Sequence, residues 1–257
     1  MSDEKNILQP GSVIGLLGGG QLARMLILAG HPLGFQFVVL DPDPAAPAGQ
    51  VGAKHLRCSY TDKKSLKEFA EQCDLVTYEF ENVDAGSVEW LEKRVDLPQG
   101  SQLLKTAQNR LNEKKTIQKL GIGVTRFREV QNLPDLEKSF EDFDSVLLKT
   151  VSGGYDGKGQ KGIKSKLEIK TAFDALHEEG VPLIAEKFQS FERELSVVVA
   201  RSRSGEIRCF PVSENLHDQN ILTICRIPAR ISEALEKEVI RIATRLAEGL
   251  GLVGVLG

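Results

Sequence analysis

The chain has 257 residues, of which 41% are hydrophobic and 27% charged, a composition typical of a globular protein with one large or two ordinary domains. Its formal net charge of −3 and the lack of a lysine or arginine stripe exclude a nucleic-acid binder that neutralises phosphates. The N-terminus lacks an apolar signal core, and glycine and proline interrupt the longest uncharged stretch, residues 25–40. We therefore expect a cytoplasmic protein without a membrane partner.

The first hundred residues alternate between apolar runs and helical periodicity, which predicts an open, doubly wound α/β sheet of the Rossmann-like kind. The continuous apolar runs suit parallel strands that are covered on both faces. The expected strands are residues 12–17, 35–40 and 74–78, and the expected helices are residues 21–29, 62–72 and 85–93.

After Pro98 the predicted strands become more polar and are interrupted by glycine, which predicts a second, α+β unit with its boundary near residue 108. Ser204-Gly205 predicts a hairpin turn between the third and fourth strands of this unit. The expected strands are residues 145–149, 182–188, 194–201, 206–212 and 252–257, and the expected helices are residues 102–108, 110–120 and 233–250. Because the last strand starts where the chain stops, we expect a fold that is cut short.

Gly18, Gly20 and Ala23 form a G-x-G-x-x-A pattern between the first strand and helix, and Asp41 ends the next strand. This pattern is close to the fingerprint of dinucleotide sites, in which glycines let the backbone approach a pyrophosphate. A tight turn that needs glycine only for packing gives the same pattern. Taken alone the pattern is weak, and an anion-binding loop is favoured over an NAD site.

A second glycine cluster spans residues 153–159 and is interrupted by Tyr155, Asp156 and Lys158, while the strand before it ends at Lys149. Such a loop exposes backbone N–H groups that can fold over phosphates, and a lysine on a rigid strand adds a point charge. It is not a Walker A loop, because Gly-Lys-Ser/Thr is absent. The alternative interpretation is a wide, solvated hairpin loop.

Further along, Glu186 to Phe188 end one predicted strand, Glu194 lies in the next, and His217 lies in a polar segment expected to be a loop. These residues are compatible with a nucleotide slot in which backbone groups meet adenine and a carboxylate accepts from ribose hydroxyls. Solvated strand ends and a surface histidine would give the same pattern. The four cysteines and four histidines show no metal-binding spacing, so we expect reduced thiols and no zinc site.

Several segments together resemble one family, the N5-carboxyaminoimidazole ribonucleotide synthetases of the ATP-grasp superfamily, over essentially the whole chain. The most specific are Gly-Gly-Tyr-Asp-Gly at 153–157 and Tyr-Glu-Phe-Glu-Asn at 78–82. The other matching segments are Gly-Gly-Gly-Gln-Leu-Ala-Arg-Met at 18–25, Asn-Arg-Leu at 109–111 followed by Lys114, Glu-Arg-Glu-Leu-Ser at 192–196 and Glu-Asn-Leu-His at 214–217.

The resemblance implies a Rossmann-like (pre-ATP-grasp) substrate domain over residues 1–108 and an incomplete α+β ATP-grasp domain over 109–257, with a glycine-rich lid at about 124–188. It also implies ATP-dependent carboxylation of 5-aminoimidazole ribonucleotide (AIR) in purine biosynthesis. Bicarbonate attacks the γ-phosphate to give carboxyphosphate and ADP, and the carboxyl group then passes to the N5 amine. Such an enzyme must neutralise phosphate charge and exclude water from a labile intermediate.

Site residues follow from the same resemblance, position by position. The ATP phosphates would be contacted by Arg110, Lys149, Gly154, Tyr155, Asp156, Gly157, Lys158, Gly159 and Gln160. The adenosine side would be lined by Glu186, Lys187, Phe188, Gln189, Glu194 and His217. AIR would be bound by Gln21, Glu79, Tyr155, Asp156 and Lys158, with Asp156 and Lys158 as the catalytic pair and Asp156 orienting the amine.

The resemblance also implies Mg²⁺ as a cofactor, held in the family by residues that would lie beyond residue 257, and it is compatible with a homodimer. We therefore expect no metal ligands in this chain, and little or no activity from it alone. Three other interpretations stay open: an ATP-grasp ligase with another amine acceptor, such as a glycinamide ribonucleotide transformylase, a nucleotide-binding module without catalysis, and an NAD-linked oxidoreductase.

Overall fold

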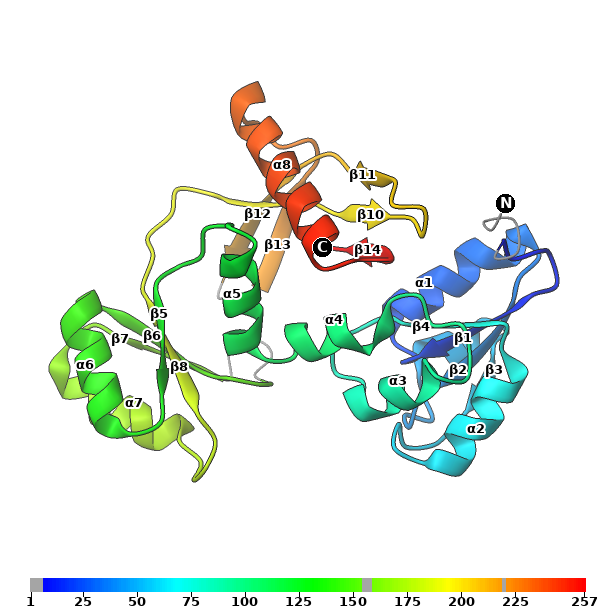
Figure 1. Ribbon diagram of the computed structural model, residues 1–257, viewed down its shortest axis with the longest axis horizontal. Coiled ribbons are helices and arrows are strands. Elements are labelled where there is room, and N and C mark those ends of the chain that lie inside the picture. Colours follow the sequence, from blue (N-terminus) through cyan, green and yellow to red (C-terminus); the bar gives the residue numbers. More distant parts are fainter. Residues whose placement is uncertain (1–6, 154–158, 219–220) are drawn as a thin grey trace. The chain divides into compact units, whose positions relative to one another are not determined.

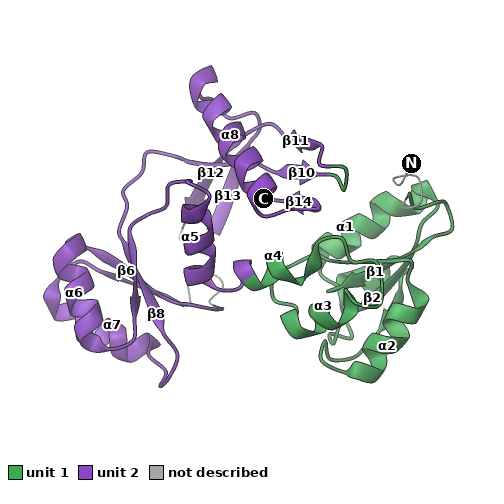
Figure 2. Ribbon diagram, viewed as in Figure 1, with its two compact units in different colours: residues 1–105, 202–204 green, residues 106–201, 205–257 purple. Residues whose placement is uncertain are grey.

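The computed structural model describes residues 7–153, 159–218 and 221–257 (Figure 1). These residues form two compact units, coloured separately in Figure 2. Unit 1 comprises residues 1–105 and 202–204, and unit 2 comprises residues 106–201 and 205–257.

Unit 1 is built on a four-stranded parallel sheet with the order β3-β2-β1-β4. Its strands are β1 (Val13–Leu17), β2 (Gln36–Leu40), β3 (Lys54–Leu56) and β4 (Leu75–Tyr78). Its helices are α1 (Gln21–Gly30), α2 (Lys63–Gln72), α3 (Ala85–Leu91) and most of α4 (Gly100–Ala107), with short 3₁₀ turns at His31–Leu33 and Pro47–Gln50. The predicted Rossmann-like alternation is confirmed.

Helices cover both faces of this sheet, which is why its central strands β1 and β2 are largely apolar. On β2, Phe37 and Val39 pack in the cluster that contains Ile27 of α1. Val38 and Leu40, which point to the opposite face, pack in the cluster that contains Phe69 of α2. The helix α2 begins at a side-chain cap, because Asp62 accepts hydrogen bonds from the N–H groups of Lys64 and Ser65.

Unit 2 contains a four-stranded antiparallel sheet with the order β5-β8-β6-β7. This sheet packs against the helices α6 and α7 in one apolar core. The strands are β5 (Phe127–Val130), β6 (Val146–Thr150), β7 (Gln160–Ile163) and β8 (Leu183–Lys187). The helices are α6 (Leu133–Phe143) and α7 (Ile169–Leu176), with a 3₁₀ turn at Lys166–Glu168. Figure 1 shows both helices on the same face of this sheet.

The remainder of unit 2 holds two three-stranded antiparallel sheets, with the orders β13-β12-β9 and β11-β10-β14. The strands are β9 (Glu194–Ser196), β10 (Val199–Arg201), β11 (Ile207–Cys209), β12 (Ser213–Asp218), β13 (Ile221–Arg226) and β14 (Gly254–Leu256). The helices are α5 (Arg110–Lys119) and α8 (Glu233–Gly249). The predicted α+β character of this unit is confirmed, and the hairpin turn at Ser204-Gly205 joins β10 to β11.

Two sequence-based predictions for this region are wrong. The expected single strand 194–201 is divided into β9 and β10, which belong to different sheets. His217 does not lie in a loop, because it is part of β12, which pairs with β13 on one side and β9 on the other. The polar composition of β12 disguised it, since its polar side chains find partners on neighbouring strands.

Candidate functional site

Arg110 and Lys149 are brought together at the end of β6 by the start of α5. Asn109 caps α5 by accepting a hydrogen bond from the N–H of Asn112 at 3.0 Å. The Arg110 guanidinium donates to the carbonyl oxygens of Thr150 at 2.9 Å and Gly153 at 2.7 Å, and its backbone N–H donates to Val151. Arg110 therefore holds the backbone that directly follows Lys149.

Glu186, on β8, is the carboxylate of this region and is only 7% exposed. Its Oε2 atom lies 3.3 Å from the Lys149 Nζ of β6 and 3.3 Å from the Lys114 Nζ of α5. The adjacent positions of β6 and β8 in the sheet explain the first contact. The second arises because Arg110 and Lys114 are four residues apart and so share one face of α5.

We call Arg110, Lys114, Lys149 and Glu186 the cationic cluster. Its four side chains carry three positive charges and one negative charge, so the set has an excess of positive charge. Glu186 and both lysines are largely shielded from water, with side-chain exposures of 9%, 16% and 21%. Cations in such a setting attract phosphate more strongly than exposed ones, because water screens them less. The excess positive charge of the cluster therefore suits a polyphosphate.

Lys114 is a member that the sequence analysis did not place in the site, although it belongs to a quoted motif. The only signal in the sequence was its spacing of four residues from Arg110. Its partner Glu186 is far away in sequence, so the contact depends on the tertiary fold.

The residues that follow Glu186 are bound to neighbouring segments through their backbone N–H groups. The Lys187 N–H donates to the Arg126 carbonyl at 2.8 Å, and the Phe188 N–H donates to the Ser145 carbonyl at 3.0 Å. The Phe188 side chain is 43% exposed, and Gln189 is exposed as well. Phe188 and Gln189 thus offer accessible side chains to a ligand.

Glu194 and His217 come together because β9 pairs with β12. The His217 Nδ1 lies 3.6 Å from the Glu194 Oε1. Asn215, which the sequence analysis did not single out, donates from Nδ2 to the same Glu194 oxygen at 3.3 Å and to the Ser196 hydroxyl at 2.9 Å. Its buried Oδ1 has no hydrogen-bond partner among the residues that the structure describes. The Glu194 carboxylate, which Asn215 and His217 approach, fits a ligand that presents hydroxyl donors.

In unit 1, carboxylates satisfy the backbone donors of the Gly18–Gly20 turn. The Gly19 N–H donates to the buried Asp41 at 2.7 Å. Glu79 follows β4 and accepts from the Gly20 N–H at 2.8 Å and the Ala23 N–H at 3.1 Å. Glu79 therefore caps the N-terminus of α1, where a dinucleotide site would hold its pyrophosphate. This geometry does not support an NAD site.

The glycines of this turn are explained by close packing. A Cβ at Gly20 would lie 2.7 Å from the Glu79 Oε1, and one at Gly18, whose φ is +95°, would lie 2.5 Å from the Phe80 ring. Gln21, the first residue of α1, is exposed beside this turn. The turn thus brings the two predicted AIR ligands of unit 1, Gln21 and Glu79, to one edge of the parallel sheet.

Five predicted site residues lie outside the described residues: Gly154, Tyr155, Asp156, Gly157 and Lys158. The loop's last two members are described. The Gly159 carbonyl accepts from the Thr150 N–H at 3.0 Å, and Gln160 starts β7 opposite Lys149. Both flanks of the glycine-rich loop are therefore fixed next to the cationic cluster.

Within residues 7–153, 159–218 and 221–257, no three histidine, cysteine, aspartate or glutamate side chains gather as a metal site would require. A metal held by three or more such side chains is therefore not found among the described residues, whereas Mg²⁺ at a nucleotide needs only one or two carboxylates besides the phosphates. None of the helices in this part of the chain is long and apolar enough to cross a bilayer.

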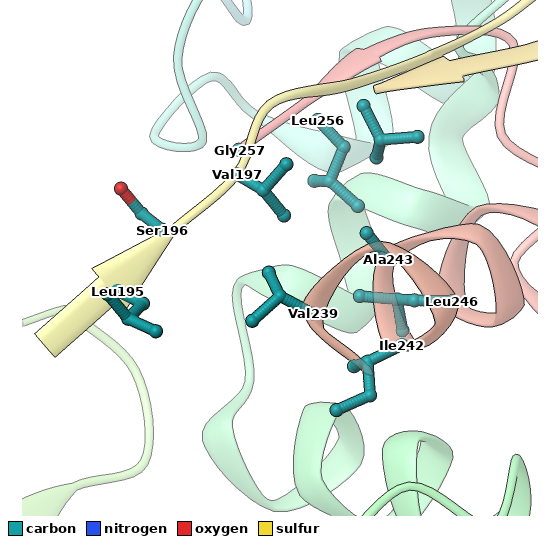
Figure 3. Close-up of a pocket in the computed structure, with 10 residues that line it drawn as sticks. Leu195, Ser196, Val197, Val239, Ile242, Ala243, Leu246, Leu256 and Gly257 are labelled. Carbon is teal, nitrogen blue, oxygen red and sulfur yellow. The ribbon is translucent and has the colours of Figure 1, made fainter. Parts of the chain in front are cut away.

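An apolar pocket of about 290 Å³ lies elsewhere in unit 2, between α8 and the strands β9, β10 and β14 (Figure 3). Val239, Ile242 and Leu246 of α8 face Leu195 and Leu256 across it. Its lining contains no charged side chain, so it does not fit a polyphosphate. None of the predicted site residues lines it.

Comparison with known proteins identifies the family. An ATP-grasp domain model matches residues 115–257, more than half of the chain, and a ribonucleotide synthetase preATP-grasp domain model matches residues 12–108. The chain therefore belongs to the ATP-grasp family.

Within this family the chain is similar to N5-carboxyaminoimidazole ribonucleotide synthases. It is 42% identical to the Bacillus subtilis enzyme over 253 residues, which cover 98% of this chain and 66% of that protein. A solved structure of the synthetase with ADP is 46% identical and has a TM-score of 0.91, covering 97% of this chain and 66% of the other. The Aspergillus clavatus enzyme, solved with ADP and 5-aminoimidazole ribonucleotide, is 30% identical and has a TM-score of 0.85. The match covers 96% of this chain and 64% of the Aspergillus chain.

The chain thus spans 66% or less of the length of these relatives. The resemblance expected from the sequence motifs is confirmed, and so is the fold class, a pre-ATP-grasp domain followed by an ATP-grasp domain.

Proposed function

We propose that this chain carries the ATP- and AIR-binding residues of an N5-carboxyaminoimidazole ribonucleotide synthase. The reaction is the ATP-dependent carboxylation of AIR. A bicarbonate oxygen bonds to the γ-phosphorus and ADP leaves, and the AIR amine then takes the carboxyl group of carboxyphosphate while phosphate leaves. Mg²⁺, a homodimer and a cytoplasmic location belong to the same proposal and rest on the resemblance and the sequence alone.

The observation that supports ATP binding best is the cationic cluster in a chain of the ATP-grasp family. Arg110 and Lys149 approach the glycine-rich loop from two elements, and Glu186 sits between two lysines at 3.3 Å. We assign Arg110, Lys149, Gly159 and Gln160 to the phosphates, together with residues 154–158. Positive charge here would offset the charge that develops on the phosphates during transfer.

The adenosine side is assigned to Glu186–Gln189 and to Glu194 and His217. The carboxylate of Glu194 is held by the Asn215 Nδ2 atom, which donates to it at 3.3 Å. A carboxylate accepts hydrogen bonds, and the neighbouring hydroxyl groups of a ribose can both donate to it. Asn215 is therefore proposed to hold Glu194 in place for the ribose.

The AIR side is assigned to Gln21 and Glu79, with Tyr155, Asp156 and Lys158 as in the family resemblance. Asp156 orients the amine, and Lys158 completes the catalytic pair. In unit 1 the supporting feature is the place of these residues: the turn before Gln21 follows β1, and Glu79 follows β4, at the carboxyl ends of two neighbouring parallel strands. Ligands bind at such positions in open α/β sheets.

Calorimetric titration of the chain with ADP, and then with AIR in the presence of ADP, tests the proposal. We expect both to bind, and glycinamide ribonucleotide, the substrate of a rival ATP-grasp ligase, not to bind. Binding of glycinamide ribonucleotide in place of AIR would identify a different acceptor. Binding of ADP without either amine would favour a nucleotide-binding module, and binding of NADH but not ADP would contradict the proposal outright.

A further inference from the structure

Lys114 has no role in the proposed ATP site, yet among the described residues it is one of two lysines that pair with Glu186. Its Nζ and that of Lys149 lie at the same distance, 3.3 Å, from the same oxygen of Glu186. The Lys149 contact is also a hydrogen bond by its geometry. One carboxylate oxygen is thus shared between a lysine assigned to the phosphates and a lysine from a different element.

Lys114 is held in place by α5. Its ammonium lies 5.9 Å from the centre of the Phe127 ring, on β5. One turn earlier, Leu111 is buried in a cluster with Val151 and Ile184, which fixes the same face of α5 against the sheet. Lys114 therefore approaches Glu186 from a well-packed helix, with only 16% of its side chain exposed.

Separating a shielded carboxylate from its single cationic partner is energetically unfavourable. If Lys149 were the sole partner of Glu186, turning its ammonium toward a phosphate would leave Glu186 buried and unpaired, which is costly. A second ammonium on the same oxygen removes this penalty, because Glu186 stays paired when Lys149 moves.

We propose that Lys114 is a positioning residue that keeps Glu186 neutralised, so that Lys149 can engage the phosphates of the nucleotide. The inference rests on the proposed ATP site and deepens it. Lys114 acts through Glu186 and does not itself contact the phosphates.

The test measures the affinities of ADP and adenosine by calorimetry for the wild-type chain and its variants. We expect Lys114→Met to weaken ADP binding about tenfold, because Glu186 then retains Lys149. Adenosine, which has no phosphate, should bind unchanged. Lys114→Arg should restore ADP binding to within about twofold of wild type, because it keeps the charge on Glu186.

Lys115→Met is the matched control. It removes the neighbouring lysine of α5, whose side chain is 52% exposed and pairs with Glu129 at 3.7 Å, and it should leave both affinities unchanged. The melting temperature of each variant reports folding, and Lys114→Gln replaces Lys114→Met if the latter does not fold.

A second pair of variants separates an action through Glu186 from a direct contact. In a Glu186→Gln background the charge that Lys114 neutralises is gone, so adding Lys114→Met should change ADP affinity by less than about twofold. A tenfold loss that persists in this background would overturn the inference, as would unchanged ADP binding by Lys114→Met or an equal loss for ADP and adenosine. Absence of ADP binding by the wild-type chain would instead contradict the proposed function, and the inference with it.

Discussion

At the scale of single residues, the two glycine-rich segments differ in the charge that surrounds them. Asp41 and Glu79 occupy the N–H donors of the Gly18–Gly20 turn, so that turn has little left to offer an anion. At the end of β6 the cations outnumber the carboxylate. The sequence motifs alone left both segments open to anion binding, and the tertiary contacts separate them.

Replacing Lys149 tests the residue on which phosphate binding depends most. Lys149→Met should weaken ADP binding by about tenfold or more, because it removes a shielded positive charge and leaves Glu186 with one partner. Calorimetry measures the change. Lys161→Met is the matched control, since Lys161 lies on the neighbouring strand β7 and is exposed. An equal loss of ADP affinity in that variant would mean that ADP responds to the net charge of the chain and not to Lys149 in particular.

Replacing Glu79 tests the cap of α1. Glu79→Ala should lower the free energy of unfolding by about 1–2 kcal/mol, because the N–H groups of Gly20 and Ala23 lose their acceptor at a helix N-terminus. Urea denaturation gives the value. Glu71→Ala, in an exposed pair with Lys67, should change it by less than about 0.5 kcal/mol, and equal effects of the two variants would argue against the cap.

Cys73 should make stability fall at alkaline pH. Burial raises the pKa of its thiol from 9.0 to about 12, and the nearby Asp74 adds to the shift. The unfolded thiol therefore ionises first, so its contribution is full below pH 9 and is lost between pH 9 and 12, with a slope of at most about 1.4 kcal/mol per pH unit.

Urea midpoints measured from pH 8 to 11 check this dependence. Cys73→Ala should flatten the curve in that range, whereas Cys225→Ala, at an exposed thiol, should not. A curve that is equally steep without the Cys73 thiol would assign the pH dependence to other groups.

At the scale of helices and strands, the structure is most predictable where the chain is apolar. The strands β1 and β2 follow from their continuous hydrophobic runs, because such runs are stable only when both faces are covered. The polar strand β12 was missed, because the Asn215 amide nitrogen and the Glu214 carboxylate have partners on β9 and β13 that periodicity cannot show. Lys114 was not predicted as a site residue for the same reason, since its proposed role depends on a contact between α5 and β8.

The junction of α5 and α8 can be tested by one glycine. A Cβ at Gly249, the last residue of α8, would lie 2.3 Å from the Leu120 Cδ2 at the end of α5. Gly249→Ala should therefore lower the free energy of unfolding by about 1–3 kcal/mol through overpacking. Gly123→Ala is the control, because nothing lies within 4 Å of the added Cβ. Similar melting temperatures for the two variants would show that Leu120 moves to accommodate the added methyl group at no cost in stability.

At the scale of the whole molecule, the chain combines a pre-ATP-grasp domain with an ATP-grasp domain. The family match and the relatives' structures agree with the fold expected from the motifs. The domain limits 1–108 and 109–257, and the lid at about 124–188, stay predictions, since motifs locate sites better than boundaries.

Hydrogen–deuterium exchange with and without saturating ADP tests most directly where the nucleotide binds. We predict slower exchange at the carboxyl ends of β6 and β8 and at Gln189, and no change at the Gly18–Gln21 turn. Protection confined to that turn, with unchanged exchange at both strand ends, would contradict the assignment of the nucleotide to the cationic cluster.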